Sequence, residues 1–549
     1  MESFNLCKKF IKKYRVMLYM YFICGILSSI VSVILPMMTG VFIDLIVYNT
    51  SKNYLKSYFY LFLILNLGKF ILEYVSKLNY VKIQTNGAYD LNYYILNHMK
   101  NLPISFFNNK DTVYLNQRIN HDSNNIIDFY ISFILNICVN IINILFSIVV
   151  IYMISKYILC VLIALTIIYM LLYSKFKIKI FKSNLEFKEK QADLFSKLND
   201  QLKNITFIKI HNLSENFGER LNKSYSKLYD KAINKQKLEC SFTFFDEIVS
   251  MCAQLTVLVL GLIGISKGTI TVGILTISIS YFNSILKSVK YFYEFGKLYQ
   301  VNLVSYNRIN ELLNIEAQYN GSKKLPCIDS ICIEDLQFKN NGRNIFNNLN
   351  LAFQKGYIYT LTGRNGAGKS TLMKLLTGMY INEYTGNINY NGIDINNIDM
   401  KHMREKFLSV TEQEPLLLND TILNNLVVNL DYYDEDKLKD LINILNLKEY
   451  IDSKPLGINS VINTDSTNLS GGEKQKIAII KSLMKKSDVI ILDEPTSALD
   501  KKTILSLKNY LTLIKKNKII LIITHDNTLY DISDIRINID ENVTLECFN

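Results

Sequence analysis

A glycine-rich run contains the residues best suited to chemistry, because it fits the phosphate-binding pattern G-x-x-x-x-G-K-[ST] at every fixed position. Its glycines allow the backbone to fold around a polyphosphate with the N–H groups directed inward. Lys369 supplies a positive charge for the β- and γ-phosphates, and Ser370 supplies a hydroxyl for Mg²⁺. A strand-like segment precedes the run and a helix-like segment follows it, which predicts an anion site at a helix N-terminus. The run consists of Gly363, Arg364, Asn365, Gly366, Ala367, Gly368, Lys369, Ser370 and Thr371.

Two acids follow a second strand-like segment, residues 489–492. Asp493 is suited to holding Mg²⁺, and Glu494 is placed at the strand's exit to polarise a water molecule as general base. Taken alone, the segment is equally well a buried strand that ends in a solvated acidic turn. The glycine-rich run elsewhere in the chain favours the catalytic interpretation.

Three further features extend this chemistry. A serine and two glycines begin a helical run and predict a second phosphate-binding helix N-terminus. Two such helix N-termini in one domain make sense if each completes the nucleotide site of a partner. His525 follows the apolar strand 519–524 and can reach a γ-phosphate, although a lone histidine there is usually a loop residue. Gln413 follows the strand-like residues 407–411 and, taken alone, is a polar surface residue. The second glycine motif consists of Leu469, Ser470, Gly471, Gly472 and Glu473.

Composition indicates a membrane protein of at least two domains. The chain has 549 residues, too many for one compact core. Hydrophobic residues make up 49%, and the mean hydropathy is +0.13. Positive cytoplasmic loops account for much of the net charge of +12, so no nucleic acid partner is expected. Nine cysteines without a CxxC pair and five scattered histidines imply no zinc site.

Apolar runs predict six membrane-spanning helices, the first of them softly broken around Pro36 and Gly40. Lysines cluster at the N-terminus and in the two long inner loops, which puts both termini and those loops in the cytoplasm. The long polar segments between spans have a helical pattern and are expected to project well beyond the bilayer. The predicted spans cover about residues 16–47, 54–76, 126–154, 157–174, 241–266 and 272–296.

Charged residues within the spans have two possible roles. Lys69 and Glu73 are four residues apart and are expected to pair. Lys287, Lys290 and Glu294 share one helical face, which favours an anionic or peptide-like substrate if it lines the pathway. The alternative is that these lysines extend to the cytoplasmic interface.

Helical patterning ends near residue 315, and short apolar strands alternate with helices from about residue 331. The predicted fold class is an all-α transmembrane six-helix domain plus a cytoplasmic α/β P-loop NTPase domain. The expected boundaries are 1–315 for the membrane domain, 316–328 for a linker and 329–549 for the nucleotide-binding domain.

The motif set, in this order and spacing, resembles the nucleotide-binding domain of ABC transporters, and the six preceding spans resemble an exporter-type half-transporter. The specific part is the second glycine motif, since the phosphate loop alone occurs in many NTPases. The resemblance implies that two chains pair head to tail, so that ATP on the phosphate loop of one is closed off by Ser470, Gly471 and Gly472 of the other. Glu494 then acts as base, while Gln413 and His525 sense the γ-phosphate. Further implied sites are Ser370, Gln413 and Asp493 for Mg²⁺, and Asp500, within the motif 497–500, at the dimer interface.

Within the membrane part, residues 102–107 with Arg118 and Asp122 look like the first intracellular loop of these exporters. Residues 205–209 resemble the second loop, and residues 305–309 the stretch leading into the linker. The resemblance implies coupling helices that rest on the ATPase domains.

Three positions depart from the family pattern. Asn340 stands where an aromatic residue usually stacks on adenine, so stacking on the base must come from another side chain or be weak. Thr464 replaces a glutamate before the second glycine motif, and Val113 replaces a glycine in the first intracellular loop. None of the three touches the phosphates or the general base.

The sequence therefore predicts an ATP-driven exporter in the plasma membrane that forms a homodimer, with a heterodimer left open. A bacteriocin-like peptide or an amphipathic drug is the expected substrate. The segment before Val16 is too short for a leader peptidase. Alternatives are a lipid flippase, an ATP-gated regulator or channel on the same scaffold, and a soluble ATPase acting on nucleic acid, which the six spans oppose.

Overall fold

The computed structural model describes residues 2–48, 52–108, 112–154, 156–340, 342–428, 430, 432–462 and 469–540. Contacts divide the chain into two compact units. Residues 1–96 and 116–314 form a helical unit, and residues 97–115 and 315–549 form an α/β unit.

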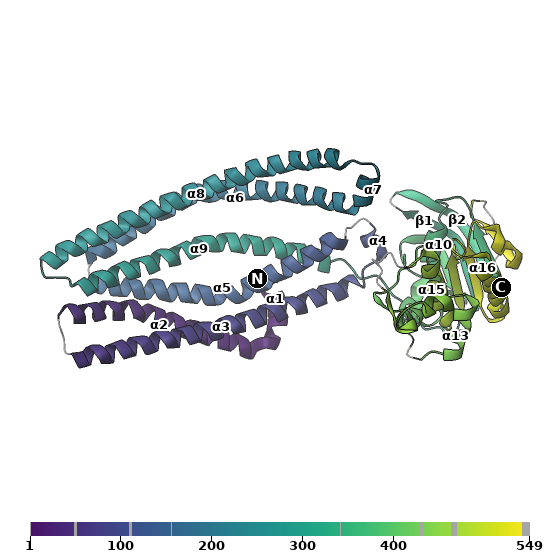
Figure 1. Ribbon diagram of the computed structural model, residues 1–549, viewed down its shortest axis with the longest axis horizontal. Helices are drawn as coiled ribbons and strands as arrows, with labels where there is room; N and C mark the ends of the chain where they lie inside the picture. Colours follow the sequence, from purple (N-terminus) through teal and green to yellow (C-terminus); the bar gives the residue numbers. More distant parts are fainter. Residues whose placement is uncertain are drawn as a thin grey trace. The chain divides into compact units, whose positions relative to one another are not determined.

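Long helices make up the described helical unit (Figure 1). The apolar spans continue without interruption into the polar segments. The first of these segments reaches its proline, Pro103, only after α3 has ended, and the second, residues 175–237, has none. α3 has 48 residues; at about 1.5 Å per residue it is longer than the roughly 30 Å apolar thickness of a bilayer. The helices are α1 (Glu2–Ile11), α2 (Arg15–Val47), α3 (Lys52–Met99), α5 (Thr112–Ile154), α6 (Lys156–Lys203), α7 (Ile205–Ile210), α8 (Ser214–Ser266) and α9 (Val272–Leu313).

Five helical segments of the described residues are long and apolar enough to cross a membrane. The first, Leu6–Val47, joins the end of α1 to α2, and the others lie in α3, α5, α8 and α9. The predicted fourth span lies in α6, where several side chains fall outside the described set, so it stays a prediction. The predicted break at Pro36 is wrong, because α2 runs through this residue and the Thr39 hydroxyl donates a 2.7 Å hydrogen bond to the Pro36 carbonyl.

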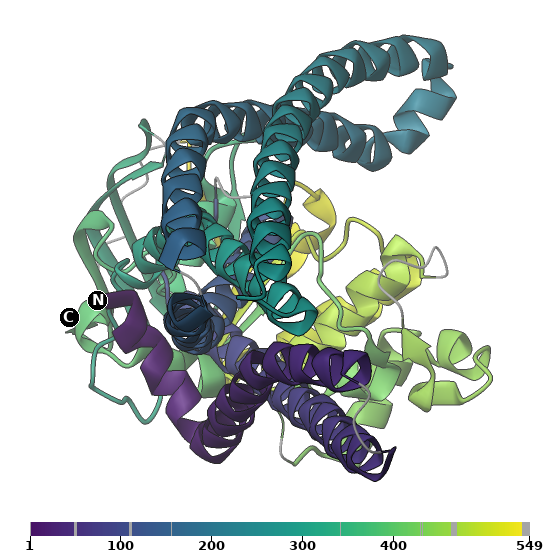
Figure 2. The same cartoon turned by 90° about the vertical axis from the view of Figure 1, so that its left-hand side faces the viewer.

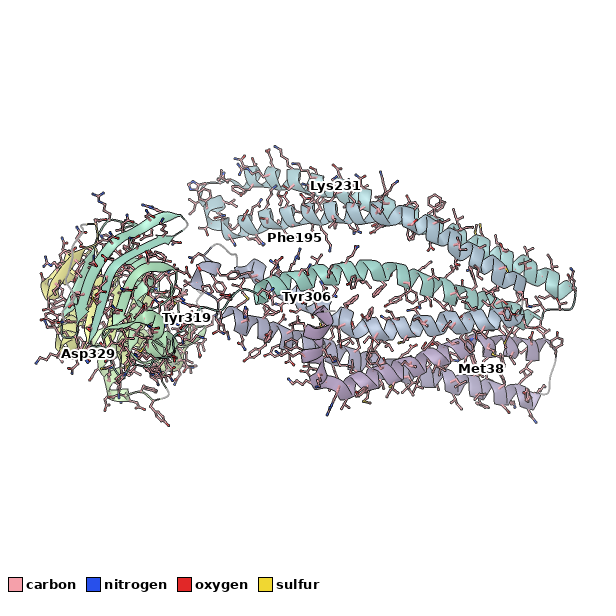
Figure 3. The ribbon with its side chains drawn as sticks, turned by 180° about the vertical axis from the view of Figure 1, so that it is seen from behind. Met38, Phe195, Lys231, Tyr306, Tyr319 and Asp329 are labelled. Carbon is pink, nitrogen blue, oxygen red and sulfur yellow. The ribbon has the colours of Figure 1, made fainter. Side chains whose placement is uncertain are left out.

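Two helix pairs are prominent in the helical unit. α6 and α8 lie side by side, and α2 packs along α9 (Figure 2). Lys231 of α8 forms a 2.7 Å ion pair with Glu186 of α6, on the stretch marked by Lys231 and Phe195 in Figure 3. The expected pair of Lys69 and Glu73 is confirmed, at 3.7 Å.

Glycines allow α2 and α9 to approach closely. A Cβ atom added at Gly40 would lie 2.3 Å from the Ile277 side chain and 2.6 Å from the Gly273 carbonyl oxygen. The Asp44 carboxylate accepts hydrogen bonds from the Thr271 hydroxyl (2.5 Å) and the Gly273 N–H (2.7 Å). This carboxylate satisfies donors at the start of α9 and fixes the two helices together.

The described strands of the α/β unit form two larger sheets and one short pair. One sheet is antiparallel in the order β2-β1-β4-β5, and the other is parallel in the order β11-β3-β10-β9-β6. The central strands β9 and β10 of the parallel sheet are nearly continuous apolar runs and fully buried, as is typical of strands covered on both faces. The strands are β1 (Ser330–Asn340), β2 (Arg343–Gln354), β3 (Ile358–Thr362), β4 (Tyr384–Tyr390), β5 (Ile393–Asp394), β6 (Leu408–Thr411), β7 (Asp420–Thr421), β8 (Val461–Ile462), β9 (Val489–Asp493), β10 (Ile519–Ile523) and β11 (Ile535–Asn538).

The helices of this unit include the two that begin at the glycine motifs, α10 and α15. Leucine and isoleucine side chains from α13, α15 and α16 form a core with β9 and β10. The helices are α10 (Lys369–Leu376), α11 (Met400–Lys406), α12 (Ile422–Leu426), α13 (Glu435–Ile444), α14 (Lys448–Asp452), α15 (Gly471–Met484) and α16 (Lys501–Ile514).

The segment that resembles a first intracellular loop belongs to the α/β unit. Its short helix α4 (Ile104–Phe107) begins after Pro103, and Ile104 packs against the core around the parallel sheet. The Ser105 hydroxyl donates a 3.0 Å hydrogen bond to Glu383, and the Lys401 ammonium donates a 2.6 Å bond to Asn101. The expected contact of this segment with the α/β domain is confirmed.

Replacing Gly40 by alanine should destabilise the α2–α9 pair, because the new methyl group would overlap Ile277 and the Gly273 carbonyl. Overpacking of this kind costs about 1–3 kcal/mol. We expect G40A to lower the melting temperature of the detergent-solubilised protein. The matched control is G68A in α3, where an added Cβ meets no atom within 4 Å; equal melting temperatures for the two variants would contradict the close approach.

Candidate functional site

The glycine-rich run forms a compact loop between β3 and α10. Its backbone has φ values of +85° at Gly366 and +100° at Gly368, which side-chain-bearing residues rarely adopt. A Cβ atom at Gly368 would also lie 2.5 Å from Ile345 and 2.7 Å from Phe346. Backbone conformation and neighbours together require glycine at position 368.

Lys369, the first residue of α10, extends back over the loop. Its ammonium donates hydrogen bonds to the carbonyl oxygens of Gly363 (2.6 Å) and Arg364 (3.1 Å). The His525 Nε2 atom lies 2.7 Å from the same ammonium, which has only hydrogens to donate, so this ring nitrogen is the acceptor of the contact. Burial lowers the pKa of Lys369. The two carbonyl oxygens and the ring nitrogen thus take the place of the water molecules that the ammonium loses on burial.

Asp493 ends β9 beside the same helix. Its carboxylate accepts a 2.9 Å hydrogen bond from the Ser370 hydroxyl, and burial raises the pKa of this acid. Gln413 adds an amide oxygen nearby, so the side chains expected to hold a metal all offer oxygen. Hard oxygen ligands of this kind fit Mg²⁺.

Glu494 lies in a strained backbone conformation. Its φ of +45° is left-handed, which is unusual for a residue other than glycine, asparagine or aspartate. The Glu494 N–H donates a 2.8 Å hydrogen bond to the Ile523 carbonyl of β10, and the Gln413 amide donates a 3.0 Å bond to the Glu494 carboxylate. Strain held by such contacts is typical of functional sites.

These groups line one cavity of about 510 Å³. Arg364 and Ala367 belong to the loop but do not line the cavity; the Arg364 N–H instead bonds to Asp540 at 2.5 Å. Of the expected site residues, the lining comprises Asn365, Gly366, Gly368, Lys369, Ser370, Thr371, Gln413, Asp493, Glu494 and His525.

Two further lining residues, Arg343 and Ile345, are absent from the sequence-based prediction. Both lie near the start of β2, which brings them beside the phosphate loop through the contact of Ile345 with Gly368. Phe338 is buried against Tyr380 at a ring separation of 4.9 Å. Asn340 pairs with Arg343 across the hairpin, so the position next to the missing aromatic residue offers a guanidinium group.

The second glycine motif does not line this cavity. Ser470 caps α15 in a capping box: the Glu473 N–H donates to the serine hydroxyl, and the Ser470 N–H donates a 2.7 Å bond to the Glu473 carboxylate. The Leu469 side chain is buried in the apolar core of the unit. A Cβ atom added at Gly472 would lie 2.7 Å from the Ala498 carbonyl oxygen. Thr464 lies outside the described residues, as does the side chain of Val113.

Asp500 also lies away from the cavity, at the start of α16. Its carboxylate accepts hydrogen bonds from the Thr503 hydroxyl (2.6 Å) and N–H (3.1 Å), which lower its pKa to about 2. Lys476 of α15 lies 3.5 Å from the same carboxylate. On the same helix, the Gln475 amide donates a 3.4 Å bond to the Glu494 carbonyl. Helix α15 is therefore connected to both acids.

Comparisons with known proteins agree with this arrangement. Residues 18–289 match the family model described as ABC transporter transmembrane region, and residues 346–497 match the model described as ABC transporter. The multidrug resistance-like ATP-binding protein MdlA of Buchnera aphidicola is 28% identical over 60% of this chain and 58% of that protein. The transport/processing ATP-binding protein ComA of Streptococcus pneumoniae is 25% identical over 87% of this chain and 66% of that protein.

The lactococcin-A transport/processing ATP-binding protein LcnC of Lactococcus lactis is 24% identical over 87% of this chain and 66% of that protein. The chain thus spans 58–66% of the length of these curated relatives. A bacterial Atm1-family ABC exporter with ATP bound has the same fold, with a TM-score of 0.81 and 18% identity over 95% of this chain and 93% of that chain.

Alanine should be tolerated better at Gly366 than at Gly368. Both positions have positive φ, but an added Cβ meets nothing within 4 Å at Gly366, whereas at Gly368 it meets Ile345 and Phe346. We expect a cost of about 1 kcal/mol from backbone strain for G366A and a larger loss for G368A. Thermal unfolding of the two full-length variants measures the difference; the reverse order would contradict the loop geometry.

Proposed function

Because this chain belongs to the ABC transporter family and carries both its transmembrane region and its ATP-binding domain, we propose that it hydrolyses ATP to export a substrate from the cytoplasm across the plasma membrane. The observation that carries the proposal is the convergence of Lys369, Asp493, Glu494, Gln413 and His525 on one cavity beneath the phosphate loop. The same chain contains helices long and apolar enough to cross a membrane.

Hydrolysis needs a base for the attacking water and positive charge for the γ-phosphate. Glu494 accepts the proton of the water, and Gln413, already bonded to this carboxylate, orients it. The N–H groups of the loop bind phosphate oxygens, and the Lys369 ammonium exchanges its loop carbonyls for them. His525, released from Lys369, then donates a ring N–H to the γ-phosphate. Mg²⁺ held by Ser370, Gln413 and Asp493 supplies further positive charge when it is bound.

Arg343 is the proposed contact for the adenine base. The residue is exposed and lines the cavity, beside the position where Asn340 replaces an aromatic ring. A guanidinium plane stacks on an aromatic base through cation–π attraction. Ile345 supplies an apolar edge next to it.

A second copy of the chain is the proposed partner. Ser470, Gly471 and Asp500 lie outside the cavity of their own chain, which supports their use on the nucleotide of another. α7, the candidate second coupling helix, leaves Phe207 52% and Ile210 73% exposed. We propose that it docks on the α/β unit of the partner. Both sets of motifs are present in this chain, so a homodimer needs no other subunit, although a heterodimer is equally compatible with them.

Coupling between ATP and transport is proposed to run through α4. Ile104 of this helix and Glu412, the neighbour of Gln413, line one groove of about 370 Å³. A shift of the segment around Gln413 on nucleotide binding therefore changes the shape of the groove in which Ile104 of α4 lies.

A peptide or an amphipathic drug is the proposed substrate class. The two transport/processing relatives align over 87% of this chain. Lipid transport is the second candidate, supported by ATP-dependent lipid A-core flippases of Saccharophagus degradans and Haemophilus ducreyi, which align over 49% and 50% of the chain. Retention of Glu494 weighs against a regulator that only binds ATP. Lysine-rich inner loops support cytoplasmic termini and a cytoplasmic ATPase domain.

Substituting Glu494 by glutamine removes the proposed base while keeping the shape of the side chain. We expect E494Q to lose ATPase activity by about 10²- to 10⁴-fold in nanodiscs, while ATP still stabilises a dimer. The control is E449Q, which changes an exposed acid of α14. Unchanged turnover of E494Q would remove Glu494 from its role, and failure of ATP to stabilise any dimer would contradict the shared site.

Substituting Arg343 by alanine should weaken ATP binding by about 2- to 30-fold, the usual range of a cation–π contact. Tyrosine at the same position should restore affinity, because an aromatic ring also stacks on adenine. Binding of ATP and of tripolyphosphate by the E494Q background measures both effects. A loss that is equal for ATP and for tripolyphosphate would assign Arg343 to the phosphates.

A further inference from the structure

A cavity of about 710 Å³ lies within the helical unit, lined by side chains from α2, α3, α5 and α9. Serine, asparagine, tyrosine and lysine dominate its wall, although these helices are otherwise apolar enough to cross a membrane. Polar and ionisable groups within membrane-spanning helices are costly and mark pathways for substrates or ions. The cavity is therefore a candidate for substrate binding.

α3 contributes a charged face to this cavity. Lys69, Glu73 and Lys77 recur every four residues and all line it. Phe70 and Tyr74 lie on another face by their spacing and are 59% and 65% exposed, as expected for side chains in contact with lipid. The rotation of α3 thus keeps its charges away from the apolar surface.

The other helices contribute neutral hydrogen-bonding groups. Asn136, Asn140 and Asn143 line the cavity from one face of α5, and each amide offers both donors and an acceptor. Ser29 of α2 is 4% exposed, and its hydroxyl has no hydrogen-bond partner within the described part of the chain. A buried hydroxyl without a partner is costly, so a polar ligand that reaches Ser29 gains a hydrogen bond.

The cavity carries excess positive charge. Lys69 is partly neutralised by Glu73 at 3.7 Å, whereas Lys77 and Lys287 form no ion pair within the described residues. Lys290, one turn beyond Lys287 on α9, does not line the cavity and instead pairs with Asp246 at 2.5 Å. The structure therefore separates the two lysines that the sequence assigns to one face.

A nearby carboxylate offsets only part of this charge. Tyr80, which lines the cavity, donates a hydrogen bond to Asp128, and Asp128 itself does not line the wall. The free positive charges of the cavity are those of Lys77 and Lys287.

We propose that this cavity binds an anionic peptide as the exported substrate. A peptide backbone presents alternating donors and acceptors that the asparagine and serine side chains satisfy, and its carboxylates pair with Lys77 and Lys287. An acyl chain fits poorly, since Leu135 and Val139 are the branched aliphatic side chains of the lining and burying the polar wall against hydrocarbon is unfavourable. The proposal rests on the export function above and names its substrate class.

The test is direct binding to the full-length protein in nanodiscs without ATP. The probe is a short synthetic peptide of glutamate and serine that carries a neutral dye, and its counterpart has lysine in place of glutamate. We expect the acidic peptide to bind and the basic one not to bind. The double variant K77Q/K287Q should weaken binding of the acidic peptide about 10-fold or more, as expected for a lost charge-assisted contact. The control K290Q/D246N removes a charge pair beside the cavity and should bind normally.

Lysophosphatidylglycerol serves as the lipid competitor. Equal binding of the acidic and basic peptides would overturn the proposal. Tight binding of the lysophospholipid that displaces neither peptide would also overturn it. The two peptides are compared on the unmodified protein, so the test holds even if a variant misfolds. Basal ATPase activity and its loss in E494Q are measured separately, so peptide binding without ATPase activity would contradict the export function and leave the cavity assignment standing.

Discussion

The ammonium of Lys369 needs partners other than water, and this requirement organises the α/β unit. Carbonyl oxygens from the loop after β3 and a ring nitrogen from the segment after β10 provide them. Ser370, the next residue, bonds to Asp493 at the end of β9. Three neighbouring parallel strands are thereby connected at one edge of the sheet. When phosphate binds, the Lys369 ammonium exchanges these protein acceptors for phosphate oxygens. This exchange costs less free energy than removing the ammonium from water at the moment of binding.

Much of this site is predictable from sequence because the carboxyl ends of parallel strands meet at one edge. Lys369 and His525 follow strands β3 and β10, and Asp493 ends the neighbouring strand β9, so their convergence follows from topology. Arg343 is not predictable in this way, since it reaches the cavity from a second, antiparallel sheet whose packing depends on tertiary contacts. The left-handed φ of Glu494 also has no sequence signal, because glutamate does not favour it.

Five of the six predicted spans of the helical unit lie in helices long and apolar enough to cross a membrane, whereas side-chain details were less predictable. The break expected at Pro36 is absent because one missing N–H does not end a helix held on its sides by neighbours, with Gly40 packed against α9. The spacing of lysines on α9 likewise did not predict the different roles of Lys287 and Lys290, because both lie on one helical face. Only the packing of α8 against α9 gives Lys290 its partner, Asp246. Side-chain roles in a bundle depend on which neighbour faces them.

Continuous helices would give the proposed export function a means of linking the membrane part of the chain to its ATP site. α3 runs from Lys52 to Met99, and the residues that directly follow, up to Leu115, belong to the α/β unit. The same helix carries Lys69 and Lys77 on its cavity face. A helix whose backbone hydrogen bonds are satisfied internally moves as a stiff element, so under the proposed export function a displacement of α4 would shift the charged face of α3. Substrate charge in the cavity and nucleotide at the phosphate loop would then bias the same element, which is the physical condition for coupling between two distant sites.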